Sequence, residues 1–329
     1  MSRSIIELNT TILASAGVVG KTEHDGPLGS YFDMHDEDDL FGADTWEKAE
    51  SEMQRRAFEL VMKKSGLREK NIGAIFAGDL LNQCVGSAYG LLDFDIPYFG
   101  LYGACSTAAE GLMLASIITS NRIYEKAAAV TSSHYCSAER QYRTPLEYGS
   151  QKTPTAQRTV TGAGAFICGN GGKVRITAGL PGIVVDKGIS DAANMGAAMA
   201  PAALSTLLRY FGETQEDPNS YDLIVTGDLG YEGGNILVEL AHIEGLDIKK
   251  PYNDCGMMIY SREVQDVHAG GSGCGCSASV LASYILPKLE KKELKRVLFI
   301  GTGAMMSPSS IQQGYAIPAV AHLIRLENN

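Results

Sequence analysis

The sequence lacks an excess of positive charge. Its 329 residues carry 28 Lys and Arg against 38 Asp and Glu, which gives a formal net charge of −10 at pH 7. Binding to the phosphates of nucleic acids, or to a bare anionic membrane, needs a surplus of basic side chains. The composition therefore excludes both as the main partner, and we expect no nucleic-acid binding. A small anion could still bind in a local basic pocket.

The sequence also lacks paired cysteines and long apolar runs. Its seven cysteines form an odd number without C-x-x-C spacing, which argues against a disulfide framework or a structural zinc site and favours a reducing compartment. The longest apolar stretch, residues 111–119, is far shorter than the roughly 20 residues that span a membrane. The first twenty residues contain Glu7 and no apolar segment typical of a signal peptide. We therefore expect a soluble chain without signal or transmembrane segment.

What the chain does have is a hydrophobic pattern that occurs twice. In the first part, apolar residues at helical spacing over 44–64 are followed by a short apolar strand over 74–79. In the second part, a helix over 201–212 is followed by a strand over 222–228. The order of the predicted elements is therefore the same in both parts.

Glycine-rich segments at 103–116 and 270–283 open a second apolar helix in each part, and each of these helices leads into another strand. The order is shared while the loop lengths differ, which favours gene duplication over chance. Strands that alternate with helices predict parallel sheets with right-handed crossovers. We expect an α/β fold of two βαβαβ-type halves, residues 1–170 and residues 171–329.

Residues 138–158 break this pattern. They show little apolar periodicity and contain several turn-forming residues, so we expect an inserted loop over the end of the sheet, where open α/β folds bind their ligands. The loop carries Arg140, Arg143, Lys152 and Arg158 against two glutamates, a local charge of +2. These residues predict an anion-binding site; the alternative is that they are solvated loop charges.

Cys105 is the strongest candidate for chemistry. It stands in Gly-Ala-Cys-Ser-Thr, where a strand-like segment gives way to an apolar helix, so the positive end of that helix would favour a thiolate. The alternative is a buried, inert thiol in a tightly packed turn.

Asp79 and Asp228 end equivalent strands of the two halves. Capping of helices is their favoured role, and calcium binding is the alternative.

The strings GACSTAAEG from Gly103 and TVTGAGAFICG from Thr159 resemble the thiolase and ketoacyl synthase superfamily. The resemblance covers nearly the whole chain and implies a duplicated thiolase-like fold in α-β-α-β-α layers, with Cys105 in the place of the nucleophile. In thiolases a histidine lies in a G-H-P-x-G segment and a second cysteine in a C-x-G-x-G segment. The matching segment at 271–275 lacks the histidine, and the matching segment at 299–303 lacks the cysteine.

The family's N-E-A-F segment is also replaced, because the matching stretch at 226–228 reads Thr-Gly-Asp. A Claisen condensation needs a nucleophile, a base and an oxyanion site, and only the nucleophile is recognisable. The resemblance therefore implies a protein that binds a ligand without catalysis and without a cofactor. The alternative is an acyltransferase in which His134 or His268 supplies the base for Cys105.

Longer strings resemble the stage V sporulation protein AD (SpoVAD) family of spore-forming bacteria. Among them are AGDLLNQ at 77–83, TSSHYCSAERQYRTPLEYGSQK at 131–152, NDCGMMIY at 253–260 and TGAMMSPSSIQQ at 302–313. The resemblance implies a protein that binds dipicolinic acid (pyridine-2,6-dicarboxylate), free or as its calcium chelate, and acts in its uptake into the developing spore. It also implies a peripheral position at the forespore or spore inner membrane, with membrane proteins of the same operon as partners.

The candidate ligand site follows from the resemblance and from the charge of the ligand. Guanidinium groups of the inserted loop would bind the two carboxylates, and Tyr142 or Tyr148 would offer a stacking face. The candidate set contains Asp79, Asn82, Cys105, Ser106, Ser133, His134, Arg140, Arg143, Lys152, Asp228, Ser272 and Cys274. We assign no metal site, and Cys105 is catalytic only if the acyltransferase alternative holds.

A homodimer is expected as well. Thiolase-like folds pair the sheets of their N-terminal halves edge to edge, and the apolar strand over 127–134 would otherwise be an exposed, aggregation-prone edge.

Overall fold

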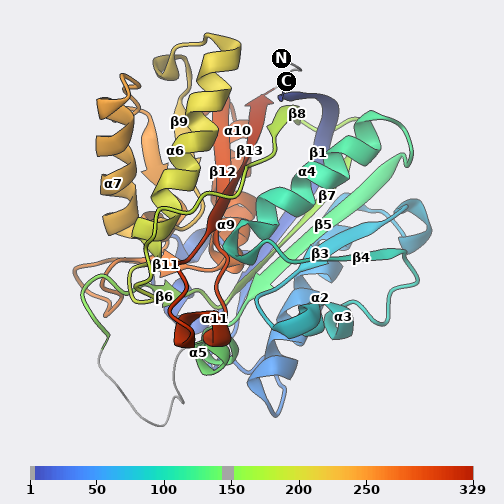
Figure 1. Ribbon diagram of the computed structural model, residues 1–329. Coiled ribbons are helices and arrows are strands. Elements are labelled where there is room, and N and C mark those ends of the chain that lie inside the picture. The colour runs from blue at the N-terminus through green and yellow to red at the C-terminus, as the bar shows by residue number, and fades with distance from the viewer. Residues whose placement is uncertain (1–3, 143–151, 329) are drawn as a thin grey trace.

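The computed structural model describes residues 4–142 and 152–328, and these form one extended system of strands covered by helices (Figure 1). The elements of the first half, in chain order, are β1 (Ile6–Val19), α1 (Lys21–His24), β2 (Met34–His35), α2 (Trp46–Ser65), β3 (Ile75–Gly78), α3 (Val85–Gly90), β4 (Tyr98–Leu101), α4 (Thr107–Ser120), β5 (Lys126–Ser133), α5 (Tyr135–Tyr142), β6 (Arg158–Thr159) and β7 (Gly162–Gly169). Arg143 and Tyr148 lie outside the described residues.

The second half repeats the order of the first. Its elements are β8 (Val174–Leu180), α6 (Met195–Thr214), β9 (Leu223–Thr226), α7 (Gly230–Ile243), β10 (Tyr252–Asp254), α8 (Cys255–Met258), β11 (Gly271–Ser272), α9 (Cys274–Val280), a π-helical turn (Leu281–Ile285), α10 (Leu286–Glu290), β12 (Arg296–Ala304), α11 (Pro308–Gln312) and β13 (Ala319–Asn328).

The strand order is the same in both halves. In the first it is β4-β3-β5-β7-β1, and in the second β10-β9-β12-β13-β8. β7 and β13 run antiparallel to their neighbours, and the other pairs within each half are parallel. β1 also pairs with β8, which joins the two half-sheets. The expected duplicated, thiolase-like α/β fold is confirmed, whereas the division at residues 170 and 171 stays a prediction.

Helices lie outside each half-sheet and between the two. α2 packs its apolar residues on the outer face of the first half-sheet, and α6 and α7 cover the outer face of the second. α4 contacts strands of both halves, and with α9 and α10 it forms the buried layer between them. Figure 1 shows α6 and α7 on one side of the molecule and α2 and α3 on the other. The burial of apolar faces on both sides of each half-sheet accounts for the layers.

The local sequence explains where α2 begins and ends. The Thr45 side chain accepts a hydrogen bond from the backbone N–H of Lys48 and so caps the first turn. Gly66 ends the helix with φ +66°, a left-handed conformation that glycine adopts without strain. Two polar residues of this helix, Glu50 and Gln54, are fully buried.

Two expectations about the surface are corrected. The strand over 127–134 is β5, which lies inside the sheet between β3 and β7, and β4 forms the edge of the first half. Residues 138–142 are not loop, because they form the last turns of α5, and Arg158 belongs to the short strand β6. β6 pairs in parallel with β11, which links the two halves beside the ends of the central strands.

Candidate ligand cavity at Cys105

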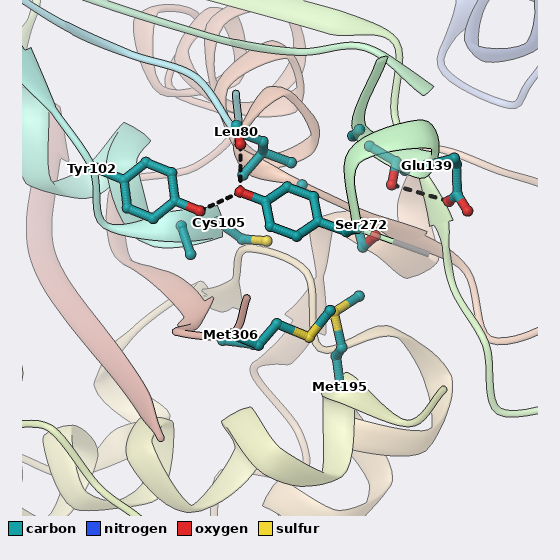
Figure 2. A pocket seen from close by; sticks show the side chains of 13 residues that line it. Leu80, Tyr102, Cys105, Glu139, Met195, Ser272 and Met306 are labelled. Atoms are coloured by element: carbon teal, nitrogen blue, oxygen red, sulfur yellow. Dashed lines mark hydrogen bonds between the residues drawn. The ribbon is translucent and has the colours of Figure 1, made fainter. Parts of the chain in front are cut away.

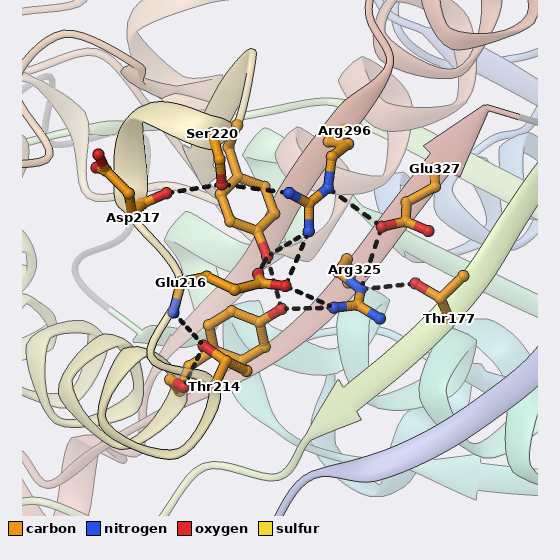
Figure 3. A network of polar contacts seen from close by, with 10 residues as sticks. Thr177, Thr214, Glu216, Asp217, Ser220, Arg296, Arg325 and Glu327 are labelled. Atoms are coloured by element: carbon orange, nitrogen blue, oxygen red, sulfur yellow. Dashed lines mark hydrogen bonds and ion pairs between the residues drawn. The ribbon is translucent and has the colours of Figure 1, made fainter.

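A cavity lies where the carboxyl ends of β3, β5 and β12 meet the N-terminal ends of α4 and α9. Its lining comes from both halves and includes Leu80, Tyr102, Cys105, Glu139, Tyr142 and Ser272 (Figure 2). Open α/β sheets bind ligands at this end of their strands. The cavity is therefore the candidate functional site.

Cys105 lies in a tight turn between β4 and α4. The preceding Ala104 has φ +50°, which is unusual for a residue with a side chain. The turn fits closely against β12, because a Cβ atom on Gly303 would lie 2.4 Å from the carbonyl oxygen of Gly103. Only 6% of Cys105 is exposed. The glycine of the segment at 299–303 thus allows the backbone of β12 to approach the Cys105 turn.

Asp228 is the ionisable neighbour of the Cys105 thiol. Its carboxylate is fully buried and accepts hydrogen bonds from Thr302 Oγ1 (2.7 Å) and from the backbone N–H of Gly273 (2.8 Å), and it lies within hydrogen-bonding reach of Cys105. Burial raises the pKa of Asp228 to about 6, so it is mostly ionised at pH 7. Asp228 therefore stands at the site as a buried carboxylate.

The thiol of Cys105 is not prepared as a nucleophile. Burial, followed by the negative charge of Asp228, raises its pKa well above the usual value. The helix N-terminus behind the sulfur acts in the opposite sense, but it does not outweigh these two effects. The expectation that the helix position favours a thiolate is thus wrong, because sequence position reports the helix end and not the carboxylate beside it.

The hydroxyl and thiol groups next to this turn mostly satisfy the backbone. Ser106 donates to the carbonyl of Gly103 (2.7 Å), Ser133 to the carbonyl of Val160 (2.7 Å), and Cys274 to that of Ser132 (3.0 Å). Cys274 also packs against Cys105 in a small apolar cluster. Ser106, Ser133 and Cys274 are thus not among the residues that line the cavity, whereas Ser272, which was also predicted, is.

Asp79 lies outside the cavity, below the loop that forms one wall. Its carboxylate accepts hydrogen bonds from the backbone N–H groups of Leu81 (2.9 Å) and Ser87 (2.7 Å) and from the Ser87 hydroxyl. Burial raises its pKa. Asp79 therefore holds the segment between β3 and α3 in place.

Glu50 of α2 lies near Asp79 and was not predicted. It accepts hydrogen bonds from Ser132 (3.2 Å) and from Ser137 of α5 (2.8 Å). Burial, and then the charge of Asp79, raise the pKa of Glu50 to about 8. A glutamate at the position of an apolar residue in the helical pattern of 44–64 was the signal that could have found it.

Neither candidate histidine lines the cavity. His134 is buried; its Nε2 contacts the carbonyl oxygen of Asp39 (2.8 Å), and its Nδ1 accepts a hydrogen bond from the N–H of Cys136 (3.2 Å). Burial lowers its pKa. His268 instead pairs with Asp266 (3.3 Å). The structure therefore brings no histidine of the described residues to the Cys105 thiol.

The basic side chains of residues 138–158 are divided between three places. Arg140 forms an ion pair with Glu47 and lies over the ring of Trp46, and with Asn82 it lines a separate surface hollow. Arg140 was expected to bind a ligand carboxylate, and this expectation is corrected, because its ion-pair partner Glu47 belongs to α2. The guanidinium of Arg158 lies 3.9 Å from the centre of the Tyr135 ring.

Lys152 is the basic residue that the structure brings close to the cavity. Its Nζ lies 3.1 Å from Oε1 of Glu139, which lines the cavity and is 5% exposed. The Thr159 hydroxyl donates to the same carboxylate oxygen (3.3 Å). In the sequence, Glu139 is one of the two glutamates that offset the basic residues of 138–158. This count of charges does not show that Glu139 lines the cavity.

The described residues contain no group of three or more His, Cys, Asp or Glu side chains arranged to hold a metal ion. In the same part of the chain, no helix combines the length and the apolar character needed to cross a membrane.

Comparisons with known proteins agree with both resemblances. A family model described as Stage V sporulation protein AD matches residues 2–327. Stage V sporulation protein AD of Bacillus subtilis (strain 168) is 42% identical over 315 residues, which cover 95% of this chain and 93% of the relative.

Solved structures share the fold at much lower identity. A variant of OleA from Xanthomonas campestris matches with a TM-score of 0.61 and 13% identity over 98% of this chain and 100% of that one. The 3-oxoacyl-[acyl-carrier-protein] synthase III from Aquifex aeolicus VF5 matches with a TM-score of 0.58 and 12% identity over 97% and 99%. At these identities the likeness establishes a thiolase-like fold and nothing about activity.

Proposed function

Since the chain belongs to the stage V sporulation protein AD family, we propose that it binds dipicolinic acid in the cavity at Cys105 and catalyses no reaction on it. In this proposal the protein captures the ligand for uptake into the developing spore. It would present the ligand to membrane proteins of the same operon while it lies peripherally at the forespore inner membrane.

One observation carries the non-catalytic part of the proposal: the cavity of a thiolase-like fold is present, but its thiol is held protonated. Cys105 lies beside the Asp228 carboxylate, and burial and this charge raise its pKa. Acyl transfer needs the thiolate, or a base that generates it. None of the described residues that line the cavity is a histidine.

The cavity also offers features that suit an anionic ligand. α4 and the continuous helical segment that starts with α9 direct their N-terminal ends toward it, and the partial positive charges there favour carboxylates. Lys152 lies behind Glu139. A carboxylate of the ligand could replace Glu139 as the partner of this ammonium.

The charge of the bound ligand is the open part of the proposal. Glu139 and Asp228 would repel a free dianion, whereas the calcium chelate is neutral and its ion could bind Glu139 directly. Calorimetric titration with dipicolinate, with and without calcium, distinguishes the two forms. Stronger binding with calcium supports the chelate, and unchanged binding supports the free acid with Lys152 as counter-ion.

The same titration tests the proposal as a whole. Dipicolinate should bind, and benzene-1,3-dicarboxylate, which keeps both carboxylates but lacks the ring nitrogen, is the matched ligand control. For the free acid, Lys152→Ala should weaken binding by about 10-fold or more, because hydrogen bonds to charged groups are worth roughly 1.5–3 kcal/mol. Lys64→Ala is the control, since Lys64 pairs with Asp33 away from the cavity. Absence of any binding in either form would disprove the assignment.

The alternative function is acyl transfer by Cys105. The observation that favours it is Asp228, a carboxylate within reach of the thiol that could accept its proton. Incubation with acyl-CoA, followed by intact-mass measurement, separates the two functions. A covalent acyl adduct in the wild type that is absent from Cys105→Ala would establish the alternative.

A further inference from the structure

The cavity at Cys105 is nearly filled by its own lining. Its open interior is about 40 Å³, room for about three water molecules at roughly 10–15 Å³ each. A six-membered ring with two carboxyl groups does not fit in that space. The wider gap between the lining residues, which includes open solvent, is about 440 Å³. The side chains that project into the gap therefore decide what can enter.

The Tyr142 side chain is one of these, and its hydroxyl is fixed at two points. It donates a hydrogen bond to the carbonyl oxygen of Leu80, and the Tyr102 hydroxyl therefore donates to it in turn. Figure 2 shows the dashed lines from Leu80 and from Tyr102 meeting at one hydroxyl. Tyr142 thus connects the two walls of the cavity.

The neighbouring residue strengthens this connection. Gln141 Nε2 donates to the same Leu80 carbonyl (3.0 Å), and Gln141 Oε1 accepts from the backbone N–H of Asn82 (3.0 Å). The end of α5 is thereby attached to the segment that follows β3. That segment continues through Gln83 and Cys84, whose φ values of +59° and +53° are unfavourable for residues with side chains.

We infer that the end of α5, through Gln141 and Tyr142, is a lid that closes the Cys105 cavity, and that a ligand ring takes the place of the Tyr142 phenol. The bonds of the closed state are few and neutral, and the opposite side of the contact is a strained segment. Opening therefore requires the loss of these bonds and of the packing of Tyr142 against the apolar cluster at Cys105. The lid does not depend on the identity of the ligand, whereas the exchange of rings rests on the proposed function.

Thiol labelling tests the lid without any ligand. Methyl methanethiosulfonate, a small reagent, is added to the full-length protein, and the labelling rate of Cys105 is followed by peptide mass mapping. Tyr142→Ala should label at Cys105 about 10-fold faster than the wild type, because it removes both the ring that fills the cavity and the two neutral hydrogen bonds that hold the lid closed. Tyr142→Phe keeps the ring but loses both bonds of the hydroxyl, so its rate should lie between the two.

Tyr89→Ala is the matched control, because Tyr89 is 68% exposed on α3 and does not line the cavity; its rate should equal that of the wild type. An unchanged Cys105 rate in a folded Tyr142→Ala protein would overturn the lid. Dipicolinate should also slow the labelling of Cys105 in the wild type. If Tyr142→Ala labels faster but dipicolinate neither binds nor protects, the lid stands and the proposed ligand is wrong.

Discussion

The buried acid Glu50 makes a quantitative prediction about stability and pH. Burial and the nearby Asp79 raise its pKa from 4.5 to about 8 in the folded protein. The folded state therefore holds this proton over a pH range in which the unfolded state releases it, so stability is highest below the unfolded pKa and falls as the pH rises toward 8. Between pH 6 and pH 9 this one group should cost about 3 kcal/mol.

Replacement of Glu50 by Gln removes the titration and keeps a side chain of the same shape. The melting temperature should fall less between pH 6 and pH 9 in Glu50→Gln than in the wild type, by about 5 °C for a chain of this size. Other buried acids contribute in the same direction, because burial raises the pKa of Glu23 and of Asp254 to about 7. They act equally in both proteins, so the difference between the two curves reports Glu50 together with its coupling to Asp79.

Glu52→Gln is the control on the same helix. Burial tends to raise the pKa of Glu52, but its hydrogen bonds with Arg55 and Arg56 outweigh this effect and lower it. Its replacement should leave the slope between pH 6 and pH 9 unchanged. Scanning calorimetry of the three proteins at several pH values measures the effect. A melting temperature that falls as steeply in Glu50→Gln as in the wild type would refute the reasoning.

Three further predictions concern the cavity and the surface. Cys105→Ala should fold normally, at a stability cost of about 1 kcal/mol, and should change dipicolinate affinity while no turnover exists to be lost; thioester hydrolysis by the wild type that disappears in the variant would contradict this. Asp228→Asn should lower the pKa of the Cys105 thiol only in part, because burial, the larger cause, remains; alkylation rates measured against pH give the shift, and an unchanged pKa would show that the Asp228 charge does not act on the thiol. Phe99→Glu should convert a dimer into a monomer in sedimentation experiments, since Phe99 is 50% exposed on β4, the edge strand through which we propose the dimer forms; a wild-type monomer at micromolar concentration would end that proposal.

Much of the fold follows from local spacing in the sequence. The expected helix over 44–64 is α2 (Trp46–Ser65), and the expected strand over 74–79 is β3 (Ile75–Gly78). The order of strands within the sheet does not follow in the same way. The apolar character of 127–134 predicts a strand at the edge of the sheet, whereas β4 forms that edge. Apolar character shows that a strand is buried, but the neighbours that bury it are set by pairing with distant strands.

The candidate site was only partly predictable for a related reason. Cys105 and Ser272 were named from short motifs, and both line the cavity. Arg140 was assigned to the ligand from the local charge of its segment. Its partner Glu47 lies 93 residues away, so no count within the segment could reveal that the charge is already paired.

An acid beside the cysteine changes what a thiolase-like cavity can do. A base next to the Cys105 thiol would take up its proton and leave an imidazolium that stabilises the thiolate. Asp228 instead carries a negative charge, so removing the thiol proton would place two anions in contact in a buried site, and the raised pKa of Cys105 expresses this cost. The neutral thiol therefore adds no second negative charge beside Asp228. In the function that we propose, helix ends and Lys152 hold the ligand without covalent attachment, and the proposed lid at Tyr142 opens to release it unchanged.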